Sequence, residues 1–189
     1  MATATSTKRK FPWTKKFGSH SITFRLLTPD DSDSIQKAVL KFANTLQPAD
    51  LIFLRMDITQ PQVVEEWVHN IRIGRTTTIL AEEDDTVVGY ANLHRSPLQW
   101  TRHMGEIRVL VGPKHRGSGI GECLFNELIH LAEDAGLERV VAHTPSNQPR
   151  VRSMLESMDF EPEALLTDWL MDRDNETHDL IIMSRSLVD

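Results

Sequence analysis

The residues that carry the most chemical information form a short glycine-rich run, Arg116-Gly117-Ser118-Gly119-Ile120-Gly121. An apolar segment over residues 107–111 precedes it, and a helical pattern begins at about Gly119. The first N–H groups of a helix lack intrahelical partners and carry the positive end of the helix dipole. Glycines lack a Cβ, so an anion can approach this backbone closely. The combination of strand, glycine loop and helix start therefore predicts a phosphate-binding site.

The helix after this loop is the clearest element of the sequence. Its apolar residues recur at helical spacing, and polar residues fill the other face. Gly136 follows the last of them and is typical of a helix end. We therefore expect a helix over about 119–135, with one buried stripe formed by Ile120, Leu124, Leu128, Leu131 and Ala135.

The remaining elements follow from periodicity and from turn residues. Thr28 or Asp30 is a candidate cap for the first helix, and Pro61 opens the second. A charged turn over residues 82–85 joins two strands into a hairpin. We expect strands over residues 22–27, 76–81, 86–93, 106–111, 139–143, 164–171 and 179–186, and helices over about 30–46, 61–71 and 150–158.

Length and composition describe one ordinary globular domain, which we place at residues 21–189. The 189 residues are 40% hydrophobic and 25% charged, and no apolar run approaches the roughly 20 residues of a membrane helix. The single cysteine, Cys123, excludes an intramolecular disulfide and fits a reducing compartment. No cysteine or histidine cluster has zinc spacing, so no metal is expected. Without an apolar leader in this sequence, we expect a cytoplasmic location.

The charge is unevenly distributed along the chain. Residues 1–20 contain five of the 21 basic residues and none of the 27 acidic ones, although the net charge is −6. We therefore expect a basic, disordered N-terminal arm over residues 1–20. The acidic remainder argues against general nucleic-acid binding, and no membrane partner is expected.

Taken together, these features resemble the GNAT superfamily of N-acetyltransferases over residues 22–187. The most specific piece, residues 111–121, matches the family motif Arg/Gln-x-x-Gly-x-Gly at Arg116, Gly119 and Gly121. Residues 155–160 resemble the family's helix-to-strand junction, with Asp159 where a glycine is usual. The loop has no Walker lysine, and it lies mid-chain rather than on a first βαβ unit, which argues against an NTPase or a Rossmann fold.

The resemblance implies an α/β (α+β) fold with a mixed, largely antiparallel, seven-stranded sheet. About four helices flank this sheet, which splits like a V between the strands around Val109 and Val141. It also implies acetyl-CoA as co-substrate and no metal. The backbone of Val109, Leu110 and Val111 would pair with the pantetheine arm. The pyrophosphate would lie on the glycine loop, formed by Arg116, Gly117, Ser118, Gly119, Ile120 and Gly121.

The implied reaction moves an acetyl group directly to a primary amine, which must first lose its proton. At pH 7 this costs about 4–5 kcal/mol for an ε-amine of pKa near 10.4, but about 1 kcal/mol for an α-amine near 7.8. Family members often carry an acidic base on the strand before the loop, which makes Glu106 the candidate general base. Its alternative role is an ion pair with Arg108 or Arg102. His103 is a second candidate that would act through water, unless it is solvated or held in the core.

The general acid has no clear counterpart in this sequence. Family members often have a tyrosine where this chain has Leu155, and the only tyrosine, Tyr90, is expected in the core. A thiol of pKa near 8.5 leaves as a thiolate without much help, so activity does not require this acid. Water or Ser153 can serve, and Cys123 is interpreted as a packing residue.

The sequence does not identify the acceptor or the oligomeric state. We expect a small-molecule or peptide amine as acceptor, bound by residues 44–75 and 97–103, and a monomer or homodimer. Two alternatives to a small-molecule enzyme share the same loop. One is a CoA-binding regulatory module without turnover, which Leu155 and Asp159 favour. The other is a protein- or ribosome-directed acetyltransferase guided by the basic arm.

Overall fold

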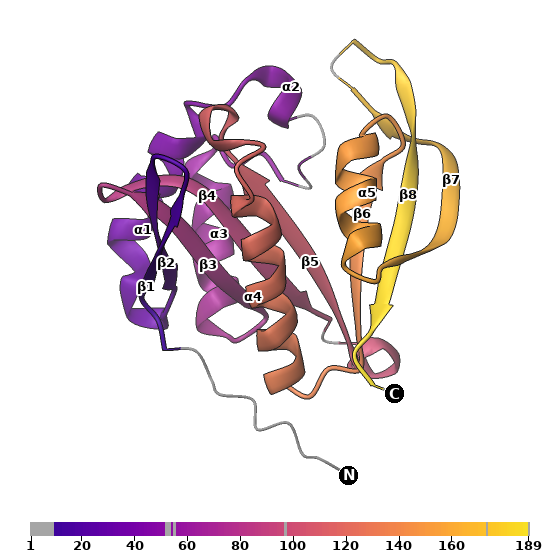
Figure 1. Cartoon of the computed structure of the whole chain (residues 1–189), viewed down its shortest axis with the longest axis horizontal. Coiled ribbons are helices and arrows are strands. Elements are labelled where there is room, and N and C mark those ends of the chain that lie inside the picture. The colour runs from indigo at the N-terminus through magenta and orange to yellow at the C-terminus, as the bar shows by residue number, and fades with distance from the viewer. Residues whose placement is uncertain (1–9, 52–53, 55, 97, 173, 189) are drawn as a thin grey trace.

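The computed structural model describes residues 10–51, 54, 56–96, 98–172 and 174–188. Its eight strands form one sheet in the order β1-β2-β3-β4-β5-β6-β8-β7 (Figure 1). Neighbouring strands are antiparallel except β5 and β6, which are parallel. The strands are β1 (Trp13–Phe17), β2 (His20–Leu26), β3 (Thr76–Glu83), β4 (Thr86–Arg95), β5 (Met104–Val111), β6 (Arg139–Pro145), β7 (Glu161–Met171) and β8 (Thr177–Ser186).

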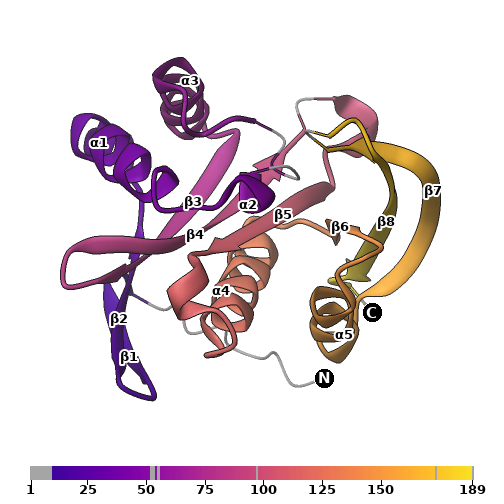
Figure 2. The same cartoon turned by 90° about the horizontal axis from the view of Figure 1, so that it is seen from above.

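Helices cover both faces of the sheet, and each face has its own hydrophobic core (Figure 2). One face carries α1 (Ser32–Ala43) and α3 (Pro61–Arg72), and the other carries α4 (Ile120–Asp134) and α5 (Pro149–Ser157). A single turn, α2 (Pro48–Leu51), completes the helices of the described residues. The expected fold class and the four main helices are confirmed. The predicted stripe of α4 is buried at its first three positions, and its last two are half-buried or exposed.

The sheet opens between its two parallel strands. Pairing of β5 with β6 covers only Met104–Glu106 and Arg139–Val141. Beyond Glu106, β5 stays paired with β4 as far as Val111, whereas β6 pairs with β8. The two strands therefore meet at one end and diverge toward the other, as Figure 1 shows. This geometry confirms the expected V-shaped split.

The expectation of a disordered arm over residues 1–20 is wrong for its second half. Residues 13–17 form β1, which pairs with β2 and supplies an eighth strand in place of the expected seven. Phe17 is buried, and the Trp13 ring stacks on Phe24 with centroids 4.4 Å apart. The charge count missed this strand because its lysines lie between two aromatic residues that the core can bury. Residues 1–9 lie outside the described residues.

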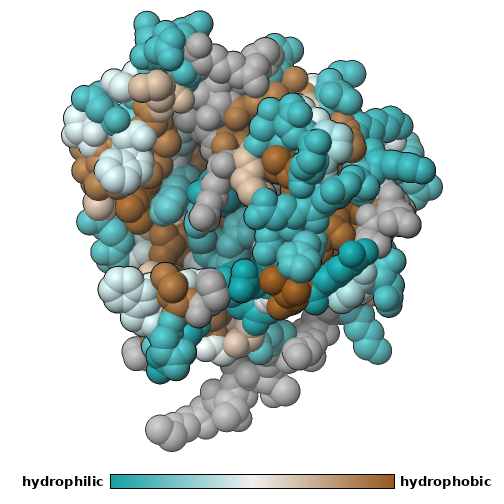
Figure 3. All heavy atoms as spheres, turned by 180° about the vertical axis from the view of Figure 1, so that it is seen from behind, coloured by the Kyte–Doolittle hydropathy of each residue, from teal (hydrophilic) through white to brown (hydrophobic). Residues whose placement is uncertain are grey.

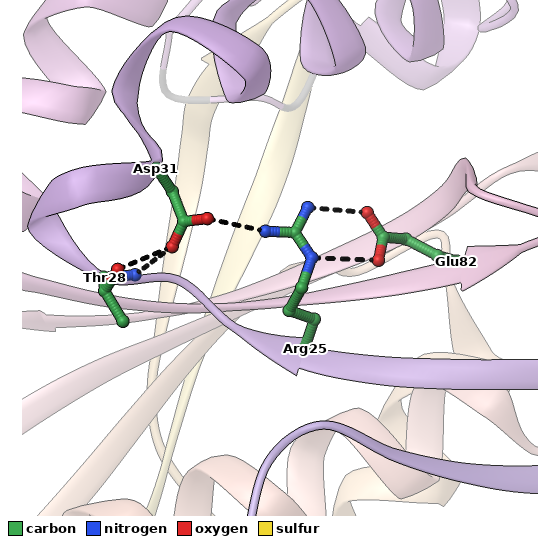
Figure 4. Close-up of polar contacts among 4 residues, drawn as sticks. All are labelled: Arg25, Thr28, Asp31 and Glu82. Carbon is green, nitrogen blue, oxygen red and sulfur yellow. Dashed lines mark hydrogen bonds and ion pairs between the residues drawn. The ribbon is translucent and has the colours of Figure 1, made fainter.

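Arg25 links β2 to β3 and to the start of α1 (Figure 4). Its Nε and Nη2 donate to Glu82 at 3.1 and 2.8 Å, and its Nη1 donates to Asp31 Oδ1 at 3.0 Å. Asp31 Oδ2 accepts from the Thr28 amide and hydroxyl at 2.8 and 2.7 Å. The N-cap position of α1 is Asp31, rather than the predicted Thr28 or Asp30.

These contacts shift the pKa of both charged partners. Burial alone would raise the pKa of Asp31, but the Thr28 hydrogen bonds and the Arg25 charge hold it below its usual value. The hydrogen bond to Glu82 raises the pKa of Arg25. The network therefore favours the charged forms of Arg25 and Asp31 and fixes the entry to α1.

The junction after α5 explains one departure from the family pattern. Asp159 has a φ of 62°, in the left-handed region where glycine is preferred and aspartate is tolerated. The backbone conformation that glycine usually supplies is therefore present.

The opposite edge of the sheet ends at β7. This strand exposes three large hydrophobic side chains, Leu165, Trp169 and Met171. The view from behind shows hydrophobic surface on the side of β7 and β8 (Figure 3). Among the described residues, no helix is long and apolar enough to cross a membrane.

Candidate active site

A cavity of about 1030 Å³ lies at the split, and we call it the split cavity. Ligand sites in proteins typically enclose roughly 300–1,000 Å³. The volume therefore suits a large ligand together with a second, smaller one. The lining comes from α3, β4, β5, the glycine loop, β6 and α5.

One wall of the split cavity is the second half of β5. Val109, Leu110 and Val111 line it, as the sequence predicts. Pairing with β6 has already stopped at Glu106, so the side of this strand that faces the split has no neighbouring strand. An extended ligand can add to such an open strand edge through backbone hydrogen bonds.

The glycine loop, residues 116–121, follows this wall and turns into α4. Gly117 and Gly119 have φ values of 71° and 91°, which only glycine adopts readily. Ser118 Oγ donates to the His115 carbonyl at 2.6 Å. Arg116 Nε donates to the Val111 carbonyl at 2.9 Å. The loop is thus held by hydrogen bonds from its own side chains to backbone carbonyls.

The predicted loop residues separate into two groups. Arg116, Gly117, Gly119 and Gly121 line the split cavity, whereas Ser118 and Ile120 do not. Ile120 is fully buried and anchors the start of α4 in the core. Arg116 also pairs with Asp50 at 2.8 Å, so part of its charge is already used within the protein.

The surroundings of Gly121 indicate whether the loop leaves space for a ligand. It lies in the first turn of α4, its φ is ordinary for any residue, and an added Cβ would meet only Val111 Cγ2 at 3.7 Å. Alanine would fit there and is favoured in helices by about 1 kcal/mol. Within the part of the chain that the structure describes, no contact requires a glycine at this position, whereas an anion close to the first helical amides would.

Glu106 lies at the point where the sheet opens. Its Oε1 forms an ion pair with Arg108 Nη2 and lies 3.5 Å from His143 Nδ1. Arg108 and His143 line the split cavity, and the Glu106 carboxylate adjoins it through them. The ion pair with Arg108, one of the two roles weighed for Glu106, is confirmed. The structure thus brings a carboxylate, an imidazole and a guanidinium to one place.

Sequence reasoning named Arg108 as an ion-pair partner of Glu106 but assigned no role to His143. His143 comes from β6, on the far side of the split, and Glu106 and Arg108 come from β5. The only available signal was that residues 139–143 form a strand bordering the expected opening. Side-chain proximity across that opening has no counterpart in sequence spacing.

His103 is not brought to the split cavity. Its carbonyl accepts hydrogen bonds from the Glu138 and Arg139 amides at the closed end of the split. His94 does line the cavity, where its Nδ1 lies 3.0 Å from Thr76 Oγ1. Of the two segments expected to bind the acceptor, residues 44–75 contribute to the lining, whereas described residues 98–103 do not. Trp100 in that second segment is 79% exposed.

The cavity end formed by α3, β3, β4 and the facing part of β5, where we propose that the acceptor binds and which we call the acceptor end, is polar and contains more arginines than acids, with Glu66 on α3 as its acidic lining residue. Arg75, Arg95 and Arg108 line the cavity. A buried hydrogen-bond chain runs from Trp67 Nε1 to Thr78 Oγ1 at 3.0 Å and on to Asn92 Oδ1 at 2.7 Å. Asn92 therefore uses its oxygen within the protein and keeps its NH₂ group as a donor.

The lining of the cavity includes Leu155, which replaces the tyrosine that often serves as general acid in the family, and Tyr90, the only tyrosine of the chain. Leu155 is almost fully buried and supplies no hydroxyl. Tyr90 is also buried, as expected, and burial raises the pKa of its phenol. Its hydroxyl therefore remains protonated at neutral pH.

A further polar cluster lies beside the glycine loop. Glu83 accepts hydrogen bonds from His20 and His115, and these lower its pKa. Glu83 lies 63 positions after His20 and 32 positions before His115 in the sequence, so no local spacing pointed to this cluster. They form a group of three potential metal ligands within the part of the chain that the structure describes.

The comparison with known proteins agrees with this geometry. Residues 44–160, more than half of the chain, match the acetyltransferase (GNAT) family. The chain belongs to this family. The L-amino acid N-acyltransferase MnaT of Escherichia coli (strain K12) is 31% identical over 96 residues. That match covers 50% of this chain and 55% of MnaT, so it spans only about half the length of the curated relative.

Solved GNAT structures share the fold over most of its length. YncA from Salmonella typhimurium, determined with its cofactor acetyl-CoA, is 22% identical with a TM-score of 0.73, covering 89% of this chain and 95% of that one. A phosphinothricin acetyltransferase from Sinorhizobium meliloti, in complex with acetyl-CoA, is 20% identical with a TM-score of 0.70, covering 88% and 89%. At these identities the likeness shows the fold alone.

Proposed function

We propose that this GNAT protein transfers an acetyl group from acetyl-CoA to the primary amine of a small acceptor that also carries a carboxylate. One observation supports this most strongly. A single cavity joins the open edge of β5 and the glycine loop to Arg108 and His143, and Glu106 lies directly behind these two lining residues. Donor and acceptor can therefore lie in one space, as direct transfer between them requires.

The donor site is built from backbone groups. The open edge at Val109, Leu110 and Val111 would pair with the pantetheine arm, and the amides from Arg116 to Gly121 would hold the pyrophosphate. The spare room at Gly121 fits this assignment, because the chain itself does not need a glycine there. Acetyl-CoA, when bound, supplies the activated acetyl thioester.

Glu106 is the proposed general base, with His143 beside it. The acceptor amine must be neutral to attack, and a positioned base contributes about 10²–10⁴-fold to such a step. In the absence of acceptor, Arg108 pairs with Glu106. An acceptor carboxylate that binds Arg108 would compete for that guanidinium and bring the amine of the acceptor close to Glu106.

The acceptor class follows from the charges of the acceptor end. Arg75, Arg95 and Arg108 would repel a polyamine but attract a carboxylate. Asn92, the strand partner of Arg108, offers an amide donor next to it. A guanidinium and an amide donor side by side can bind a carboxylate. The similarity to an L-amino acid N-acyltransferase points to the same class, amines of the amino-acid type.

Thiolate departure needs no dedicated acid in this proposal. Leu155 and the buried Tyr90 offer no acidic proton near neutral pH. A thiol of pKa near 8.5 is a good leaving group, and water or the proton gained by the Glu106–His143 pair can neutralise it.

Release of the CoA thiol, measured over a matched acceptor panel, tests the proposal. Each amino acid is compared with its amide and with its decarboxylated amine, and polyamines and peptides complete the panel. We expect turnover with the free amino acids and at least about tenfold lower kcat/KM for the compounds that lack the carboxylate. Equal rates with and without the carboxylate would contradict the acceptor class.

A thermal shift with acetyl-CoA separates this enzyme from a regulatory module. A ligand that binds only the folded state must raise the melting temperature. We expect a raised melting temperature together with turnover. Binding without turnover over the whole panel would favour the CoA-binding module instead.

The protein-directed alternative is tested by removing residues 2–9. Deleting all of residues 1–20 would also remove β1 and its buried Phe17, so the shorter deletion is the cleaner one. We expect unchanged kcat/KM for the small acceptors. Loss of activity on a protein substrate alone would support the alternative.

A further inference from the structure

Three side chains that the proposed reaction does not use converge beside the glycine loop. His20 is the first residue of β2, and Glu83 is the last residue of β3. His115 ends the short 3-10 helix Pro113–His115, one residue before the glycine loop. Three separate elements thus place two imidazoles and one carboxylate at the same point.

The contacts within this cluster all run through Glu83. His20 Nδ1 lies 2.9 Å from Glu83 Oε1, and His115 Nε2 lies 2.8 Å from Glu83 Oε2. The two imidazole rings are 4.8 Å apart between centroids. The potential ligand atoms all lie within 4.8 Å of one another.

These separations are close to those around a transition-metal ion. Zn²⁺ binds imidazole nitrogen at about 2.0–2.1 Å and carboxylate oxygen at about 2.0–2.2 Å, so neighbouring ligand atoms in a tetrahedral site lie roughly 3.3–3.6 Å apart. Each nitrogen–oxygen pair needs to open by less than about 1 Å to reach that spacing. Two imidazoles and one carboxylate are a donor set that zinc, copper, nickel and iron accept.

The cluster is also accessible and held in place. The side chains of His20, Glu83 and His115 are 35%, 25% and 13% exposed, so an ion can enter from solvent. The His115 amide donates to the Gly112 carbonyl at 2.9 Å, and the His115 carbonyl accepts from Ser118. Three further pairs, His130 with Glu133, His143 with Glu106 and His178 with Asp172, offer one imidazole and one carboxylate each. Only the first cluster is a group of three or more such ligands within the described residues.

We propose that His20, Glu83 and His115 form a binding site for one divalent transition-metal ion, with Zn²⁺ as the reference ion. The ion replaces the two hydrogen bonds to Glu83. Each imidazole binds the ion through the lone pair of an unprotonated nitrogen, so in the bound state each ring carries its proton on the other nitrogen. A fourth position remains open to water.

Such an ion would join the β1–β2 hairpin, the β3–β4 hairpin and the start of the glycine loop. His20 lies at the turn of the first hairpin, where it pairs with Phe17. The bound state therefore ties the N-terminal hairpin to the loop, and binding to the folded chain must raise the melting temperature.

Isothermal titration of the metal-free, tag-free chain with Zn²⁺ tests the proposal. We expect one Zn²⁺ per chain and a raised melting temperature. Co²⁺ should give the visible absorption of a four-coordinate site without a thiolate charge-transfer band. Absence of binding, a stoichiometry other than one, or a thiolate band from Cys123 would overturn the proposal.

Variants assign the ion to the cluster. His20→Gln and His115→Gln each remove one ligand from a different element but keep a group able to donate to Glu83, and circular dichroism checks that each is folded. We expect each to lower Zn²⁺ affinity at least about 100-fold, since even outer-shell changes cost 10–100-fold. His130→Gln, which changes an exposed pair of only two groups, should leave the affinity unchanged. Equal affinities in all three variants would place the ion elsewhere.

Discussion

The donor side and the acceptor side of the split cavity are built in different ways. The donor side is one continuous segment, residues 109–121, and it presents mainly backbone groups from an open strand edge and a helix start. The acceptor side is a set of side chains from α3, β3, β4, β5 and β6, among them Arg75, Asn92, Arg108 and His143.

The difference has a chemical reason. A pyrophosphate is recognised by amides and a helix dipole, which any suitable backbone supplies if side chains do not block it. An acceptor is recognised by particular donors and charges, which must be side chains in fixed positions. Substitutions on the two sides should therefore alter different kinetic constants, and the following predictions test that separation.

The largest effect is expected at Glu106. Glu106→Gln keeps the shape of the side chain but removes the proton acceptor, so kcat should fall by about 10²–10⁴-fold at neutral pH. The loss should be partly reversed as the pH rises and more of the amine becomes neutral. Steady-state rates against pH, with acetyl-CoA affinity measured by calorimetry and expected to stay unchanged, provide the test. The control is Glu138→Gln, which changes an exposed acid at the closed end of the split. An unchanged pH–rate profile in Glu106→Gln would mean that another group is the base.

The next largest effect is expected at Gly121. Gly121→Glu places a side chain and a negative charge at the anion site, and we expect at least about a 100-fold loss of acetyl-CoA affinity. The melting temperature should hold or rise, because an acid in the first helical turn is favourable. Gly121→Ala is the matched control and should be more stable by about 0.4–1 kcal/mol with a smaller loss of affinity. Calorimetric affinity retained in Gly121→Glu would show that the loop is not the phosphate site.

A smaller effect is expected at Arg108. Arg108→Gln removes the guanidinium but keeps an amide donor. KM for a carboxylate-bearing acceptor should rise about 10–100-fold, because one charge-assisted hydrogen-bonded pair with the acceptor is lost. KM for acetyl-CoA and the rate with a decarboxylated amine should change little. Arg102→Gln, an exposed arginine that does not line the cavity, serves as control. A rise in the acetyl-CoA KM would mean that the two sides are not separate.

The smallest effect is expected at Asp31, which lies outside the cavity. Its pKa is lowered in the folded state, so its ionised form stabilises the fold above the unfolded pKa of about 3.9. This contribution is lost as the pH falls through the lower folded pKa. Asp31→Asn should therefore cost about 1 kcal/mol at pH 7, and the difference from the unchanged chain should shrink toward pH 3. Thermal unfolding of both proteins at pH 7, 5 and 3 measures this difference in stability. A difference that does not change with pH would show that Asp31→Asn acts through packing rather than through charge.

Most of the fold and the donor side could be predicted from the sequence. The α4 stripe and the β3–β4 hairpin follow from local periodicity and turn residues, whereas the split between β5 and β6 was implied by the family resemblance. β1 was missed because the composition argument considered the five positive charges of residues 1–20 and gave no weight to Trp13 and Phe17, the aromatic residues at the two ends of the strand. Asp159 was noted as unusual, and its left-handed backbone now gives the reason for the glycine preferred there.

The acceptor side could be predicted only in part. Glu106 was named because it lies on the strand before the loop, and Arg108 was named as its possible ion-pair partner, but His143 was not. His143 comes within 3.5 Å of it from a strand 37 positions later in the chain. His103, three residues away in sequence, lies instead at the closed end of the split. Closeness in sequence was therefore a poor guide to closeness in the cavity.

The sequence by itself determined the local structure of the proposed donor side, because the strand, the glycines and the helix start that form it are consecutive and depend only on backbone geometry. Tertiary structure decided everything that depends on side chains from separate elements: the Glu106–Arg108–His143 cluster, the arginines of the acceptor end and the His20–Glu83–His115 cluster. The physical reason is that a backbone site needs only local conformation, whereas a side-chain site exists only once the sheet has brought distant strands together.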